Sequence, residues 1–152
     1  MRKRTRSREF ALQVLYQIDI NQGVLAEVLE DFWKDRSDLD LTDQEKIDIE
    51  HDKKDIEVRA YAESLVRGAL GKIAEIDTII ERFAENWEIH RMAYVDRNIL
   101  RLSTFEMCYI DDIPVKVAIN EAVELAKRYG EPDSSKFVNG ILDKIAKNEC
   151  KK

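Results

Sequence analysis

The chain has 152 residues, of which 37% are charged and 44% hydrophobic, and its formal net charge is −6. A chain of this length can bury a core without metals or disulfides, so one compact domain is expected. Five glycines and two prolines leave little turn chemistry for a many-stranded sheet, which favours helices. No apolar stretch is long enough for a signal peptide or a membrane span. The cytoplasm is therefore the expected compartment, with no membrane partner.

The charges are segregated along the chain. Residues 1–8 carry five basic side chains and no acid, whereas residues 27–57 carry thirteen acids and five basic residues, a net charge of −8. The basic segment over residues 1–7 is either a mobile arm that pairs with RNA phosphates or an unstructured tail without that role. The acidic stretch over about residues 34–55 is expected to be a solvated insertion.

Hydrophobic spacing predicts an all-helical fold of about seven helices and no strand. The first helix starts at Ser7 and ends near Gly23, which is expected to adopt the left-handed conformation that terminates helices. A second helix follows from Val24 and fades into the acidic stretch. Within that stretch, Thr42 and Glu45 have the spacing of a capping box, which predicts a short extra helix.

In the second half of the chain, apolar residues keep helical spacing over residues 56–84, and we expect a bend or break near Gly71. The pattern restarts over residues 95–107, continues over 114–129 and ends with a last helix after residue 134, capped by one of two serines.

One glycine, Gly140, stands inside the predicted last helix. Glycine weakens a helix interior, so a close approach by another backbone is the natural compensation. We expect that approach to come from a neighbouring helix rather than from a ligand.

The residues give little support for catalysis or metal binding. Cys108 and Cys150 have no CxxC spacing, and His51 and His90 have no partner nucleophile or ligand nearby in the sequence. No glycine-rich phosphate loop is present. We therefore expect a protein that is not an enzyme and has no cofactor and no metal site.

Two segments carry a specific resemblance: Lys116 to Lys127 and Asp133 to Lys144 resemble the signature of the NusB family. Arg8 to Tyr16 and Asp96 to Arg101 extend the resemblance over most of the chain, while the acidic stretch departs from it. The resemblance implies two packed antiparallel helical bundles. It also implies a transcription antitermination factor for ribosomal RNA operons. Its partners would be boxA-like single-stranded RNA, the ribosomal protein NusE and the antitermination complex on RNA polymerase.

Carried across by position, the resemblance implies a set of RNA-contacting residues: Arg4, Arg6, Arg8, Gln13, Tyr16, Arg101, Asp133, Ser134, Lys136 and Phe137. It places Asp96 and Arg97 on the side that faces NusE. The carboxylate of Asp133 would repel phosphate and so limit affinity. Read from the residues alone, Tyr16 can instead belong to the edge of the core, and residues 96–101 can be a salt-bridged, outward-facing surface.

Two other functions stay open. The first is a helical module that binds proteins only, in which the basic segment is incidental. The second is the RNA-binding part of an RNA methyltransferase system, because a NusB-like domain also occurs in front of an RNA cytosine methyltransferase; that enzyme needs a further domain with a cofactor-binding sheet. Self-association into a homodimer is also left open, since members of the family differ in this property.

Overall fold

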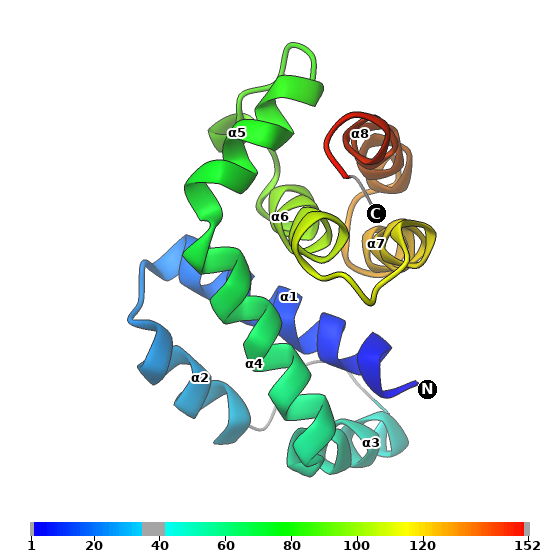
Figure 1. Cartoon of the computed structure of the whole chain (residues 1–152). Helices are drawn as coiled ribbons and strands as arrows, with labels where there is room; N and C mark the ends of the chain where they lie inside the picture. Colours follow the sequence, from blue (N-terminus) through cyan, green and yellow to red (C-terminus); the bar gives the residue numbers. More distant parts are fainter. Residues whose placement is uncertain (1, 35–41, 151–152) are drawn as a thin grey trace. The chain divides into compact units, whose positions relative to one another are not determined.

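The computed structural model describes residues 2–34 and 42–150, and these residues form helices and no strand. The all-helical class is confirmed, with eight α-helices in the described residues against about seven expected. Their bounds are α1 Lys3–Asn21, α2 Leu25–Lys34, α3 Asp43–Lys54, α4 Ile56–Gly71, α5 Ile73–Phe83, α6 Tyr94–Tyr109, α7 Val115–Tyr129 and α8 Ser134–Asn148, with a short 3-10 helix η1 at Ile89–Arg91 (Figure 1).

The contacts within the chain divide it into two compact units, residues 1–64 and residues 65–152, and the boundary falls within α4. No helix among the described residues is both long enough and apolar enough to cross a membrane.

The first unit has an aromatic core between α1 and α2. The ring of Phe10 meets the rings of Phe32 and Trp33 edge-on, each at a centroid distance of 5.6 Å. The indole N–H of Trp33 donates to Glu63 on α4 at 2.8 Å. Edge-to-face pairs of this kind add to the burial energy of the rings, so this cluster fixes α2 against α1.

The end of α1 differs from the expectation. The left-handed residue is Gln22, with φ 55°, whereas no described glycine has a positive φ. Gln22 tolerates this conformation because its backbone N–H donates to Ile18 and its side-chain amide donates to the carbonyl of Asp19. The prediction that Gly23 would take the left-handed position is therefore wrong by one residue.

The short extra helix in the acidic stretch is confirmed as α3. The hydroxyl of Thr42 accepts from the N–H of Glu45, and the Glu45 carboxylate accepts from the N–H of Thr42, as the capping box predicted. No side chain of α3 is buried. Residues 35–41, the remaining part of the predicted insertion, lie outside the described residues.

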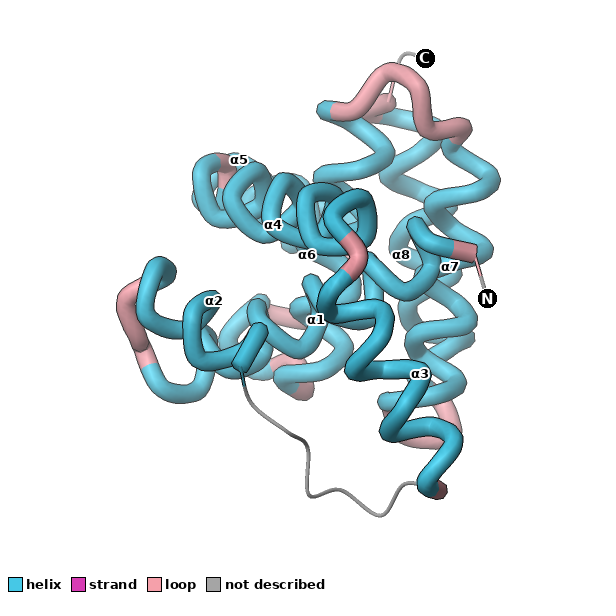
Figure 2. Tube along the Cα trace, turned by 90° about the horizontal axis from the view of Figure 1, so that it is seen from below, coloured by secondary structure: helices cyan, strands magenta, loops and turns pink. Residues whose placement is uncertain are grey.

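The second unit is built around α6, which lies among α5, α7 and α8 (Figures 1 and 2). Ten of its side chains are buried, on nearly every side of the helix. The predicted break near Gly71 is confirmed, because α4 ends there and α5 begins at Ile73. Gly68 allows close packing: a Cβ on it would lie 2.0 Å from the ring of Phe105 on α6.

The last helix corrects two expectations. Neither serine caps it; Asp133 holds the N-cap position, and the hydroxyl of Ser134 instead accepts the backbone N–H of Glu131 at 2.9 Å. No helix of the described residues packs over Gly140, since a Cβ built on it meets none of their heavy atoms within 4 Å. The glycine therefore needs another explanation than close helix packing.

Candidate nucleic-acid interface

The predicted RNA-contacting residues fall in both units, five on α1 and five on α6, α8 and the residue before α8.

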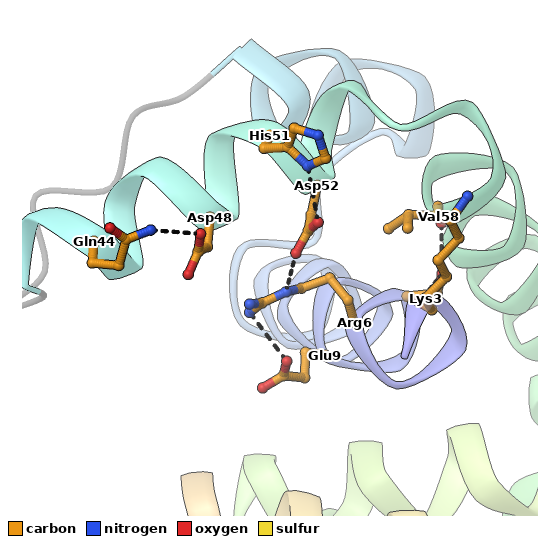
Figure 3. A network of polar contacts seen from close by, with 9 residues as sticks. Lys3, Arg6, Glu9, Gln44, Asp48, His51, Asp52 and Val58 are labelled. Carbon is orange, nitrogen blue, oxygen red and sulfur yellow. Dashed lines mark hydrogen bonds and ion pairs between the residues drawn. The ribbon is translucent and has the colours of Figure 1, made fainter. Parts of the chain in front are cut away.

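On α1, the predicted basic segment is helical from Lys3 onward, whereas a mobile arm or an unstructured tail was expected over residues 1–7; the mobility of the segment stays a prediction. Arg6 is only 8% exposed, and its Nε donates to Asp52 on α3 at 2.8 Å while its Nη1 donates to Glu9 at 3.2 Å (Figure 3). The hydroxyl of Ser7 donates to the carbonyl of Val58 at 2.7 Å. The acidic stretch thus supplies Asp52, one of the two carboxylates that accept hydrogen bonds from Arg6.

Lys3 lies in the same network. Its ammonium group lies 3.2 Å from the carboxylate of Glu57 and 3.3 Å from that of Asp55. Hydrogen bonds to Glu57 and Asp55 raise the pKa of Lys3 above its ordinary value. The pKa of Asp55 is lowered, first by the backbone N–H of Val58 that it accepts and then by Lys3. The pair with Glu57 is exposed and therefore weak, whereas the side chain of Asp55 is only 19% exposed.

Arg4 and Arg8 share one aromatic partner. Their guanidinium carbons lie 4.6 and 5.9 Å from the ring centre of Tyr61 on α4. Arg8 is buried, whereas Arg4 is exposed. A guanidinium stacked over a ring is a geometry that arginine also uses when it binds phosphate, and Arg4 is the more exposed of the two arginines.

The two remaining predicted residues of α1, Gln13 and Tyr16, are less buried than Arg6 and Arg8. Gln13 is half-buried. Tyr16 is 37% exposed, so part of its side chain is accessible at the surface of the first unit.

In the second unit, the structure corrects the expected orientation of α6. Arg97 and Arg101 are each 8% exposed and do not form an outward-facing surface. The reason is that α6 is packed on nearly every side, so even its polar face is covered.

Both of these arginines bind protein groups. Arg101 forms two hydrogen bonds to the carboxylate of Asp77 on α5, at 2.8 and 2.9 Å, and a third to Asn98. Arg97 lies 4.2 Å from the ring centre of Tyr94 and donates to the carbonyl of His90 in η1 at 3.3 Å. A bidentate arginine–carboxylate pair is strong and geometrically specific, which gives Arg101 a structural role.

A pocket of about 280 Å³ lies at the start of α8. It brings together three predicted RNA residues and one predicted NusE residue. Its lining includes Asp96, Asp133, Ser134 and Phe137, together with Trp87, Arg91, Met92, Ala93 and Glu131. One carboxylate oxygen of Asp96 is buried and has no hydrogen-bond partner among the described residues. Residues 37 positions apart in the sequence therefore share one concave site.

Trp87 is a candidate that the sequence analysis missed. Its ring meets that of Phe137 edge-on at 5.7 Å, and 49% of its surface is exposed. The sequence could have indicated it, because an aromatic residue between two predicted helices lies in a connecting segment, and such segments run over the protein surface. Lys136 on α8 is also exposed, whereas Ser134 is buried and serves the loop before the helix.

The described residues contain no group of three or more histidine, cysteine or acidic side chains placed to hold a metal ion. The candidate residues instead carry aromatic rings, ammonium and guanidinium groups, and carboxylates. Rings and cations together are what single-stranded RNA recognition uses.

Comparison with known proteins gives one answer. The profile of the NusB family matches residues 5–147. The chain is 44% identical to the transcription antitermination protein NusB of Myxococcus xanthus over 146 residues, covering 96% of each chain, and 40% identical to that of Listeria monocytogenes over 144 residues, covering 95% of this chain and 96% of the relative.

Solved structures agree with the sequence comparison. The fold is similar to that of NusB from T. maritima, with a TM-score of 0.79, 36% identity, and coverage of 97% of this chain and 92% of the other. It is also similar to a NusB chain in a structure of the antitermination factors NusB and NusE in complex with dsRNA. There the TM-score is 0.75 at 33% identity, covering 97% of this chain and 98% of the other.

Proposed function

This chain belongs to the NusB family, and on that premise we propose that it is a transcription antitermination factor that binds RNA together with a ribosomal protein partner. The RNA is boxA-like and single-stranded, the partner is the ribosomal protein NusE, and the setting is an antitermination complex on RNA polymerase that supports processive transcription of ribosomal RNA operons. The supporting observation is a likeness that covers 97% of this chain and 98% of a NusB chain solved with NusE and dsRNA.

Both units belong to this function. The matched region of the family profile runs from residue 5 to residue 147, so it includes α1 and α8 alike. We therefore treat the whole chain as one NusB-like RNA-binding domain.

On the RNA side, α8 supplies groups that are available in the free chain. Phe137 with Trp87 offers an aromatic platform for an unpaired base, and Lys136 offers a cation for phosphate. On α1, Arg4 and Tyr16 are accessible, whereas Arg6 and Arg8 are buried and contribute only if their present contacts open.

On the protein side, Asp96 and Arg97 have different roles in this proposal. Asp96 lines the pocket at the start of α8, and one of its carboxylate oxygens is buried without a hydrogen-bond partner among the described residues, so this oxygen can accept a donor from NusE only if the pocket opens. Arg97 acts through η1, because its guanidinium donates to a carbonyl of that segment. Asp133 lies on the pocket rim, where its charge opposes phosphate.

The test is a titration of a short boxA-like RNA with the full chain, alone and with purified NusE. We expect specific binding that NusE strengthens, and a scrambled RNA of equal length should bind more weakly. Phe137→Ala should weaken RNA binding by about 1 to 3 kcal/mol if the ring stacks on a base. A chain that binds NusE but shows no preference for boxA-like RNA in either condition would overturn the proposal and favour a purely protein-binding module.

A further inference from the structure

The open face of Gly140 has no explanation in the fold. The residue lies in the middle of α8, where glycine lowers helix stability relative to alanine. Its φ is not positive, and a Cβ built on it meets no heavy atom within 4 Å. Neither backbone conformation nor packing among the described residues therefore requires a glycine here.

Gly140 lies between an aromatic pair and a cation. Phe137, three residues earlier, contacts Trp87 with a centroid distance of 5.7 Å. Lys144, four residues later, lies 3.6 Å from the carboxylate of Glu85. Helical spacing puts Phe137, Gly140 and Lys144 on one side of α8, over about 10 Å along the helix axis.

The segment after α5 runs beside this side of α8, because Glu85 and Trp87 reach its two ends. Trp87 is 49% exposed, so its ring remains open to a further contact. The side chains of Glu85 and Lys144 are 79% and 50% exposed, and an ion pair this exposed exchanges readily for another anion.

We propose that Trp87, Gly140 and Lys144 form a subsite for one nucleotide of single-stranded RNA, none of them among the residues that the resemblance assigned to RNA. The base stacks on the ring of Trp87, the sugar lies against the bare backbone at Gly140, and the phosphate meets the ammonium group of Lys144 in place of Glu85. An aromatic ring, an unobstructed backbone and an ammonium group follow one another in the order of a nucleotide's base, sugar and phosphate.

This subsite rests on the proposed function. Gly140→Ala tests it, because the variant should raise the stability of the chain and lower its affinity for RNA. Alanine is the better helix former and meets no obstacle, so the melting temperature should rise by about 2 to 4 °C. The added methyl group should nevertheless weaken binding of a boxA-like RNA about tenfold, because it occupies the surface on which the sugar lies.

Asn139→Ala is the matched control. Asn139 is an exposed neighbour on α8, and its replacement also improves helix propensity, but the side chain points about 100° away around the helix. This variant should gain stability and keep full RNA affinity. Equal RNA affinity of Gly140→Ala and the wild type would overturn the subsite.

A second pair of variants tests the phosphate contact. Lys144→Gln should reduce the slope of log affinity against log salt by about 0.7, the value for one phosphate contact on a single strand. Lys147→Gln removes a cation from the same helix that pairs with Asp143 at 3.0 Å, and it should leave the slope unchanged. Equal slopes for both variants would remove Lys144 from the subsite.

The outcomes separate the two proposals. If the wild type shows no preference for boxA-like RNA with or without NusE, the proposed function fails and the subsite fails with it. If the wild type binds this RNA and Gly140→Ala binds it equally, only the subsite fails. If Gly140→Ala weakens association with NusE at unchanged RNA affinity, the face contacts a protein and the nucleotide assignment is wrong.

Discussion

The start of α1 and the exposed side of α8 both carry basic residues predicted to bind RNA, but the two differ in what their side chains already contact. On α1, Arg6 donates to Asp52 and Glu9, and Lys3 pairs with acids of the segment that follows α3. On α8, Lys136 is exposed and the backbone at Gly140 is uncovered. A basic stretch of sequence is therefore not the same as an available basic surface.

The difference matters for affinity. Binding phosphate at Arg6 or Lys3 replaces one anion by another, so the net gain from each such exchange is small. Five basic residues in residues 1–8 would set a salt slope of roughly −3.5 if all paired with a single strand. We expect the measured contribution of this segment to be smaller, since part of its charge stays with carboxylates of the chain.

The largest expected effect concerns Arg101, a predicted RNA residue that the structure places in contact with Asp77. Arg101→Ala leaves that carboxylate without its bidentate partner and should lower the free energy of unfolding by about 2 to 3 kcal/mol. Urea denaturation followed by circular dichroism measures this change.

Arg91→Ala serves as the control, because Arg91 is exposed and its pair with Glu88 is a surface pair worth about 0 to 1 kcal/mol. At a temperature where all variants are folded, Arg101→Ala should keep the salt slope of RNA binding. If the stability is unchanged and the slope falls by about 0.7, Arg101 contacts phosphate. Arg101 would then be available to RNA, as Lys136 on α8 is.

Much of the fold could be predicted because its signals are local. Apolar spacing over four residues marks the helices, and the capping box of Thr42 and Glu45 spans three positions. The break at Gly71 likewise follows from the intrinsic weakness of glycine in helices. Features of this kind do not depend on what lies elsewhere in the chain.

The site was less accessible to sequence analysis because its contacts join distant segments. Arg6 and Asp52 are 46 positions apart, and Arg101 and Asp77 are 24 apart. No local pattern indicates which acid meets which base. For the same reason Arg97 was placed outward on the periodicity of its own helix, although neighbouring elements cover that side as well.

An intermediate effect is expected from Asp52→Asn, which removes the charge opposite Arg6. Glu9 would then be the only one of these two partners with a charge opposite to the guanidinium, so RNA affinity should rise by up to about 1 kcal/mol if Arg6 reaches phosphate. Stability should fall by a similar amount, since the side chain of Arg6 is largely buried. Fluorescence anisotropy with labelled RNA measures the affinity.

Asp48→Asn is matched to this variant in charge. It lies on the same helix, and its carboxylate accepts from Gln44 rather than from Arg6 (Figure 3). It should change long-range electrostatics equally and leave the stability of α1 unaltered. If the two variants raise affinity by the same amount, the effect is one of net charge and Arg6 is not released for RNA.

The smallest effect is a pH dependence at the start of α1. The pKa of Asp55 is lowered from its ordinary value of 3.8, first by the N–H of Val58 and then by Lys3. Because the folded-state pKa is the lower one, the stabilisation is fully present above the ordinary pKa and disappears as the pH falls through the folded value. Asp55→Asn should therefore reduce the loss of melting temperature on acidification below about pH 4, relative to Asp48→Asn. If the melting temperatures of both variants fall on acidification by as much as that of the wild type, the carboxylate of Asp55 does not help to hold the basic segment. The difference between the start of α1 and α8 would then depend on the contacts of Arg6 alone.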